Sequence, residues 1–475
     1  MTFRCPERDQ QMWLPASIDE YVAPDDPVRA YDAFVDTLDW RTLGIVADEH
    51  QAGCSAYHPN TMLKILVYGY SYGIRSSRKL ERALHHNLAF IWIAGGLKPD
   101  FKTISRFRRD HRAALKTMIK HCAQLCVKLD LMAGNTLFVD GSKFRANAGL
   151  GAGFTAKSCD EQLQRIDQRI DELLAECERV DTQEAQDDSM VRLKEDLAEQ
   201  KCRRQHIEAA AAQLKAQGLK QINTTDPDST LMRSRQGCHA AANAQIVTDE
   251  QHGLIVHSDV VTDNNDRKQF AGQIQAAQAV TGQRPAVAGA DSGYYSGQEL
   301  EAMAAVAPTV LVPVRGQVHP SKDKPFAKAH FTYLADEDVY VCPAGHRLTS
   351  RRTDEAHRWR EYQLDGPTCC ACEHYTQCTR GRNGRKIVRY FNEALRDQFR
   401  RQYERPENRA IYKRRGQTVE LIFGHFKRNL GAGHFLLRGL EGMRAELSLL
   451  ASVFNVTRLM SLLGVSGLIA RLSAL

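Results

Sequence analysis

Residues 137–148 read LFVDGSKFRANA, an apolar run that stops at Asp140 and is followed by a glycine, a serine and two cations. An Asp-Gly pair between two strand-like runs is a strong signal for a β-hairpin turn. A carboxylate at the end of a strand, followed by small residues that let a ligand approach the backbone, is also the pattern of a binding site at the edge of a sheet. This stretch alone leaves both interpretations open.

The composition is that of a globular protein with more than one domain. A chain of 475 residues is long enough for two or more domains with cores of their own. It has no run of 18 or more apolar residues and no basic amino-terminal segment followed by an apolar one, so neither membrane spanning nor secretion is expected. Thirteen cysteines without a secretory signal indicate free thiols or a metal site rather than a disulfide framework. We expect a cytosolic protein.

Positive charge is concentrated in two stretches. From Arg380 to Arg428 there are fifteen Lys or Arg against five Asp or Glu, and a second basic stretch, KPDFKTISRFRRDHR, spans residues 98–112. A solvated helix face explains either stretch alone. Two of them in one cytosolic chain favour binding to the phosphate backbone of nucleic acid.

Residues 15–130 have a helical pattern. Breaks occur at 24–27, 58–60 and 95–96, and apolar residues recur at helical spacing between them. Short helices that end in a basic segment suit a helix-turn-helix DNA-binding domain, although plain helical packing explains the same pattern.

Strand patterns flank a second helical region. Residues 157–216 carry Leu and Ile at spacings of three and four, interrupted by the polar stretch DTQEAQDDS, which predicts an antiparallel helical hairpin. Strand-like segments lie on both sides of it, at 136–140, 243–249, 254–261, 286–291 and 309–314. The sequence therefore predicts a fold of the α/β class: a mixed sheet covered by helices, with the hairpin as an insertion.

Three acidic residues stand out against this pattern. Asp140 and Asp291, the latter in GADSGYYS, each end a strand, and Glu420 lies in a basic helical segment with Lys427 on the same face. Three carboxylates brought together would bind Mg²⁺ or Mn²⁺ and support phosphoryl transfer. Other acids fit turn or capping positions and are left outside this set, namely Asp226, Asp228, Asp263 and Asp266.

Cysteines cluster between residues 317 and 400, a region that looks like a second insertion. Four of them could supply thiolates to a structural Zn²⁺, namely Cys342, Cys369, Cys372 and Cys378. Their irregular spacing keeps reduced structural cysteines as the alternative. Cys122 and Cys126, four residues apart in an apolar helical segment, are interpreted as core residues.

Several motifs together resemble the DDE transposases of bacterial insertion sequences, which have an RNase H-like catalytic core. They cover most of the chain and are HPNTMLKILVYGYSYGIRSSRKLERALHHNLAFIWIAGG, PDFKTISRFR, VDGSKFRANA, TTDPDSTLMRSRQG, NAQIVTDEQHGLIV, GADSGYYS and QTVELIFGHFKRNLG. The resemblance implies that Asp140, Asp291 and Glu420 bind the metal ions. It also implies that Tyr412, Arg415 and Lys427 form the signature around the glutamate that handles the transposon end. Arg414 is predicted to contact DNA because it lies in the basic stretch at 380–428. Four residues separate Arg415 from Glu420, whereas the family signature usually has three.

The resemblance further implies a mechanism and a domain order. Such enzymes bind terminal inverted repeats, cut the element's ends with water and transfer the freed 3′ hydroxyl to target DNA, typically as homodimers on paired ends. A DNA-binding regulator and a nuclease without strand transfer remain alternatives. The expected domains are a helix-turn-helix-like domain (1–132), an RNase H-like core (133–156 and 218–316), the hairpin (157–217), the cysteine-containing insertion (317–400) and carboxyl-terminal helices of the core (401–475).

Overall fold

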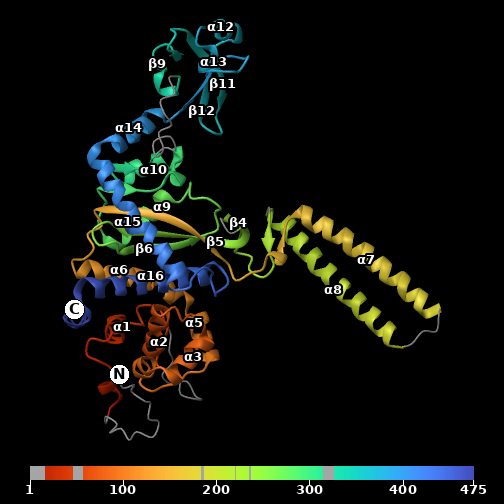
Figure 1. Cartoon of the computed structure of the whole chain (residues 1–475), viewed down its shortest axis with the longest axis vertical. Coiled ribbons are helices and arrows are strands. Elements are labelled where there is room, and N and C mark those ends of the chain that lie inside the picture. Colours follow the sequence, from red (N-terminus) through yellow and green to blue (C-terminus); the bar gives the residue numbers. More distant parts are fainter. Residues whose placement is uncertain (1–16, 46–56, 183–186, 220, 235–236, 314–325) are drawn as a thin grey trace, which may run out of the picture. The chain divides into compact units, whose positions relative to one another are not determined.

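The computed structural model describes residues 17–45, 57–182, 187–219, 221–234, 237–313 and 326–475 (Figure 1). It divides into two compact units. The first unit comprises residues 1–132, 141–264 and 419–475, and the second unit comprises residues 133–140 and 265–418. The α/β class predicted from the sequence is confirmed.

The first unit begins with helices whose ends follow from local sequence. They are α1 (Pro27–Asp36), α2 (Pro59–Ser71), α3 (Ser77–His86), α4 (Leu88–Ile93), α5 (Phe101–Asp110) and α6 (Arg112–Lys128). Asp26 caps α1 by accepting the N–H of Val28 at 2.9 Å, and Asp100 caps α5 by accepting the N–H of Thr103 at 2.7 Å. The predicted amino-terminal helical region is therefore confirmed. Cys122 and Cys126 are fully buried on α6, as expected.

The main sheet has six strands, namely β1 (Thr136–Arg145), β4 (Thr230–Ser234), β5 (Gly237–Asp249), β6 (Ile255–Val261), β7 (Val287–Gly289) and β8 (Thr309–Leu311). Their hydrogen-bonded order is β4-β5-β1-β7-β8, and β6 also pairs with β5. β5 is antiparallel to β4 and β6, whereas β7 is parallel to β1 and β8. The predicted mixed sheet is present, but the sequence pattern missed β4 and the first half of β5.

Helix α16 (Leu440–Leu463) is the central helix of the first unit and lies beside α6 (Figure 1). Asn455 on α16 exchanges hydrogen bonds of 2.8 and 2.7 Å with the backbone of Ile255 in β6. Among the described residues, α16 is the one helix long and apolar enough to cross a membrane, and 61% of its apolar window is buried inside the protein. This burial explains its composition as that of a core helix. The neighbouring helices are α15 (Pro406–Arg428) and α17 (Val465–Ser473).

Two acids from the loop before β4 hold the start of α16. Asp228 Oδ2 accepts the N–H of Leu440 at 2.8 Å, and Asp226 Oδ1 accepts the N–H of Gly439 at 3.2 Å. Burial raises the pKa of Asp226. Both residues are capping residues, as the sequence interpretation expected.

A buried ion pair ties the turn before α3 to the segment that follows α15. Arg75 Nη1 lies 2.6 Å from Glu446 Oε1, with side-chain exposures of 5% and 0%. The guanidinium also donates to the carbonyls of Gly431 and His434, and Glu446 Oε2 accepts the N–H of Leu436 at 2.8 Å. The pair therefore fixes the course of the chain after α15.

The predicted helical hairpin is present as α7 (Ala156–Thr182) and α8 (Asp187–Gln217), two long antiparallel helices (Figure 1). The middle of the predicted connection, residues 183–186, lies outside the described residues. A short antiparallel pair, β2 (Gly153–Phe154) and β3 (Ile222–Asn223), closes the base of the hairpin. Here a small core contains Phe154, Cys159, Ile166, Ile207, Ala210, Leu214 and Ile222.

The second unit contains α9 (Phe270–Thr281), α10 (Gly297–Val306), α14 (Glu393–Glu404) and an antiparallel sheet in the order β13-β12-β11-β10-β9. The strands are β9 (Thr332–Leu334), β10 (Val339–Val341), β11 (Arg347–Asp354), β12 (Trp359–Gln363) and β13 (Lys386–Tyr390), and the short helices α12 (Gly366–Cys370) and α13 (Tyr375–Cys378) join β12 to β13. The sequence indicated an insertion here but not its sheet.

Asp338, at the turn between β9 and β10, accepts hydrogen bonds from three side chains of this sheet. Its carboxylate accepts hydrogen bonds from the hydroxyls of Tyr333 and Tyr362 and from the guanidinium of Arg360, which donates at 2.8 Å. Burial raises the pKa of Asp338, but these partners outweigh burial and hold the pKa below its usual range.

Candidate active site and DNA-binding surfaces

Asp140 lies within a strand. β1 runs from Thr136 through Asp140 and Gly141 to Arg145 without a break. The hairpin interpretation of LFVDGSKFRANA is therefore wrong. The reason is tertiary, because β1 has a neighbouring strand on each side, β5 and β7, and this pairing keeps the Asp-Gly pair extended.

Asp140 lies within β1, and Asp291 follows β7, the adjacent parallel strand. The register pairs Thr136 with Val287 and Phe138 with Gly289, so extending it by two residues sets Asp140 opposite Asp291. Residues opposite each other in parallel strands face the same side of the sheet, and their backbones lie about 4.8 Å apart. The two carboxylates therefore lie close enough to each other for the charges of both to raise the pKa of Tyr294.

Two glycines shape the backbone around Asp291, namely Gly289 before it and Gly293 after it. A β-carbon at position 289 would lie 2.7 Å from Cδ1 of Phe138, so only glycine fits beside that ring. After the strand, Asp291 Oδ1 accepts the N–H of Gly293 at 2.7 Å and caps a short 3-10 helix. This bond fixes the orientation of the Asp291 carboxylate.

The electrostatics of the buried Tyr294 reveal a third acid near this pair. Burial raises the pKa of Tyr294, and the negative charges of Asp266, Asp140 and Asp291 raise it further, while Arg415 opposes them. From the sequence, Asp266 is expected to be a turn or capping residue. Its charge nevertheless acts on the same tyrosine as the two strand-end carboxylates.

Arg415 of α15 contacts the pair directly. Its Nη2 lies 3.1 Å from Asp140 Oδ1, and the exposures of the two side chains are 7% and 15%. Arg415 is thus buried against an acid of the candidate site, whereas the resemblance implied only a contact with DNA. A guanidinium at this position offsets the charge of two neighbouring carboxylates.

Glu420 and Lys427 belong to the first unit, on the second half of α15. Glu420 is exposed, and Lys427 lies two helical turns later on the same face. The Lys427 ammonium donates to Ser142 Oγ at 2.6 Å and to the carbonyl of Lys143 at 3.1 Å, and it lies 4.7 Å from the centre of the Phe144 ring. Burial lowers the pKa of Lys427. These contacts attach the end of α15 to residues 142–144 of β1, which follow Asp140.

The other two predicted DNA-contacting residues lie on the first half of α15. Arg414 is exposed, as a phosphate contact requires. Tyr412 is half-buried and packs edge-on against Tyr403, with ring centres 5.2 Å apart.

The four predicted zinc ligands line one small cavity of the insertion, about 30 Å³ in volume. They are Cys342, Cys369, Cys372 and Cys378. Burial raises the pKa of the Cys369 and Cys378 thiols. Across the described ranges, no group of three or more His, Cys, Asp or Glu side chains is arranged to hold a metal ion, either at this cavity or around Asp140 and Asp291.

A second basic surface lies in the amino-terminal helices. Lys102, Arg106 and Arg109 recur at helical spacing on one face of α5, and with Arg78 they line a hollow of about 430 Å³. The opposite face of α5 is buried, and it includes Arg108, whose guanidinium donates to the carbonyl of Arg75 at 2.7 Å. The basic stretch at 98–112 therefore divides into an exposed cationic face and a structural arginine.

Two family models match the chain. One is described as "Transposase domain (DUF772)" and covers residues 16–110, and the other is described as "Transposase DDE domain" and covers residues 341–460. The chain belongs to the DDE transposases of insertion sequences. The first match contains most of the amino-terminal helices of the transposase, and the second contains its cysteine cluster, Glu420 and Lys427. Asp140 and Asp291 lie outside both matched segments. No curated protein and no solved structure matches the transposase.

Proposed function

We propose that this transposase binds the terminal inverted repeats of its element and catalyses metal-dependent cleavage and strand transfer. The observation that supports this most is the position of Asp140 and Asp291 on and just after two adjacent parallel strands, where the charges of both act on the buried Tyr294. Two carboxylates on neighbouring strands repel each other unless a cation lies between or beside them. Capping of the short 3-10 helix accounts for the position of Asp291 but not for that of Asp140.

The reaction consists of two displacements at phosphorus. In the first, the oxygen of water bonds to the phosphorus at the element's end, and the bond from phosphorus to the 3′ oxygen breaks. That oxygen leaves with the electron pair and takes up a proton, which gives a free 3′ hydroxyl. In the second, this hydroxyl loses its proton as its oxygen bonds to a phosphorus of the target strand, and the 3′ oxygen there leaves.

Mg²⁺ or Mn²⁺ would be the cofactor, and Asp140, Asp291 and Glu420 would hold it. Carboxylate oxygens are hard donors that suit these cations, and a cation pair would activate the attacking oxygen and stabilise the leaving one. Cationic side chains of the protein would contact the phosphates of the DNA. Arg415 reaches the position beside Asp140, and Lys427 is held on Ser142 close behind it in the sequence.

The basic face of α5 and the exposed Arg414 would hold duplex DNA through its phosphates. The resemblance further supports a homodimer on paired ends and a cytoplasmic location at the nucleoid. The transposase domains support the transposition of DNA rather than a purely regulatory role.

We also propose that the cysteine cavity holds one structural Zn²⁺. Its four thiols are soft donors that line one cavity, in a module with a small core and no disulfide among the described residues. Protein produced with zinc and washed with a weak chelator should retain one zinc per chain, and Cys372→Ser should release it and lower the unfolding temperature of the insertion. Zinc-free protein with unchanged stability would leave reduced cysteines as the explanation.

The decisive test of the proposed function uses a duplex that carries the inverted repeats flanking the coding region. With Mg²⁺, the protein should cut at the repeat ends and join the freed 3′ ends to a second duplex. Cleavage without joining would indicate a nuclease. Binding without cleavage in either Mg²⁺ or Mn²⁺ would indicate a regulator.

A further inference from the structure

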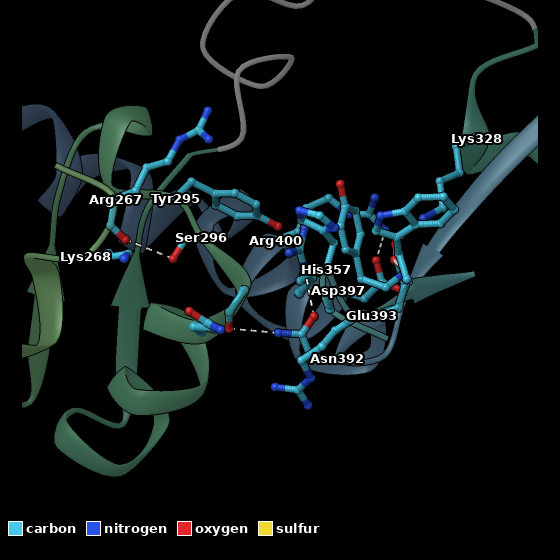
Figure 2. Close-up of a pocket in the computed structure, with 17 residues that line it drawn as sticks. Arg267, Lys268, Tyr295, Ser296, Lys328, His357, Asn392, Glu393, Asp397 and Arg400 are labelled. Carbon is cyan, nitrogen blue, oxygen red and sulfur yellow. Dashed lines mark hydrogen bonds and ion pairs between the residues drawn. The ribbon is translucent and has the colours of Figure 1, made fainter. Parts of the chain in front are cut away.

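A large cavity in the second unit has a cationic lining. It has a volume of about 880 Å³ and lies between the segment before α9, the start of α10, the turn between β11 and β12, and α14 (Figure 2). Six Lys or Arg side chains line it against two acids, Glu393 and Asp397. The six are Arg267, Lys268, Lys328, Arg358, Arg396 and Arg400.

Ion pairs within the cavity neutralise only two of these cations. Lys328 pairs with Glu393 at 2.5 Å, and Arg400 pairs with Asp397 at 2.6 Å. Arg358 pairs with Glu301 of α10, which does not line the cavity. The other three, Arg267, Lys268 and Arg396, have no carboxylate partner among the described residues. Their charge is therefore available to an anionic ligand.

Arg396 is held in a fixed position. Its guanidinium carbon lies 3.7 Å from the centre of the Tyr390 ring and 5.4 Å from that of Tyr295, and its Nε donates to Asn392 Oδ1 at 2.9 Å. Asn392 is fixed in turn by donating to the carbonyl of Gly297 at 2.8 Å (Figure 2). Tyr390 thus supports an arginine on its ring face, so the cavity presents a fixed cation to phosphate oxygens.

Size and position indicate which phosphates fit. The cavity approaches the upper limit of about 1,000 Å³ for pockets that enclose a drug-sized molecule, so it exceeds what one phosphate needs and is too small for a duplex. α10 begins in its wall, and the amino end of a helix favours anions. Tyr295 in the lining is only four residues from Asp291 in sequence.

We propose that this cavity binds consecutive phosphates of an unpaired DNA strand that leads away from the Asp140–Asp291 pair. This inference rests on the proposed function, because that function supplies the cut strand. Arg396 makes the fixed contact, and the exposed Arg267 and Lys268 contact neighbouring phosphates. Duplex DNA binds elsewhere, on the basic faces of α5 and α15.

The first experiment removes charge from the cavity. Binding of a labelled oligothymidylate is measured over a salt series without divalent cations. Replacing both Arg267 and Lys268 with Ala should reduce the slope of log affinity against log salt by about 1.4, at about 0.7 per contact in single strands. Between 50 and 200 mM salt, the wild-type affinity should therefore fall about sevenfold more than that of the variant. The matched control, Arg192→Ala with Lys194→Ala, removes the same charge from exposed positions of α8 and should leave the slope unchanged.

The second experiment displaces Arg396 without changing any charge. A β-carbon at Gly297 would lie 2.6 Å from Arg396 Nη2, whereas one at Gly272 of α9 would meet nothing within 4 Å. Gly297→Ala should therefore weaken oligothymidylate binding several-fold and leave binding to a duplex of the same length unchanged, and Gly272→Ala should change neither. ATP should compete only weakly, because it offers one phosphate chain and no continuing strand.

The outcomes separate this inference from the proposed function. Equal losses for single strand and duplex, or for cavity and control variants, would show a general charge effect and overturn the inference. Strong competition by ATP would do the same and assign the cavity to a free nucleotide. If the wild type cuts and joins DNA while the cavity variants bind single strands normally, the inference alone fails. Absence of cutting by the wild type would count against the proposed function.

Discussion

Replacing Glu446 with Gln should destabilise the first unit strongly, although the two side chains have nearly the same shape. Glu446 is completely buried and makes an ion pair of 2.6 Å with Arg75, whose exposure is 5%. Its other oxygen accepts the N–H groups of Leu436 and Leu437. An amide can still accept hydrogen bonds, but it leaves the Arg75 charge buried without a counter-charge.

The magnitude follows from this burial. Removing one partner of a buried ion pair costs about 3–5 kcal/mol, whereas an exposed pair contributes less than about 1 kcal/mol. Glu441 provides the matched control on the same helix. It pairs with Lys116 and Arg444 at 3.1 and 3.0 Å, and its side chain is 51% exposed. Glu441→Gln should therefore cost less than about 1 kcal/mol.

Hydrogen exchange followed by mass spectrometry measures both effects locally, on peptides from α2 and α16. In Glu446→Gln, opening of these helices should become about two to three and a half orders of magnitude more frequent, because each 1.4 kcal/mol corresponds to a factor of ten. A companion variant, Arg75→Met with Glu446→Gln, should recover most of the protection because it buries no charge. Equal protection losses in Glu446→Gln and Glu441→Gln would show that burial does not set the contribution of the Arg75–Glu446 ion pair.

Three further predictions concern other parts of the chain. Gly289→Ala should lower the free energy of unfolding by about 1–3 kcal/mol, measured by urea titration, because the added methyl group overpacks against Phe138. An unchanged free energy of unfolding would mean that the strands can separate without cost. The folded pKa of Asp338 is lowered, so its contribution to stability is complete above the unfolded pKa of about 3.9 and is lost as the pH falls through the folded pKa. Asp338→Asn should therefore make the free energy of unfolding less dependent on pH below about pH 4. An unchanged pH dependence in this range would contradict the prediction. Replacing Arg106 and Arg109 with Ala should lower the slope of log affinity for duplex DNA against log salt by about 1.8. An unaltered slope would show that α5 does not contact the DNA phosphates.

Local chemistry made part of the fold predictable. Asp26 and Asp100 begin helices at the breaks in the sequence pattern, and the Leu and Ile spacing of the hairpin predicted both of its helices. The sheet of the insertion was not predictable in this way. Its longest strand, β11, has one buried residue among eight and no alternation of polar and apolar side chains.

Long-range pairing limited prediction of the site. Asp140 and Asp291 each end a strand-like run, which the sequence shows, but their register depends on contacts between segments 150 residues apart in sequence. Only the fold shows that Arg415 pairs with Asp140 and that Asp266 acts on Tyr294. No local pattern distinguishes a buried arginine from the exposed ones beside it.

The most direct test of the central claim is single-turnover cleavage of a duplex carrying the inverted repeats in Mg²⁺, with DNA affinity measured in parallel. Asp140→Asn and Asp291→Asn should each slow cleavage by roughly a hundredfold or more, because loss of cation stabilisation is worth several kcal/mol, and each should bind DNA as tightly as the wild type. Asp336→Asn removes an exposed acid of the same unit and should leave the rate unchanged. An Asp140→Asn protein that cuts repeat ends at the normal rate would contradict the account.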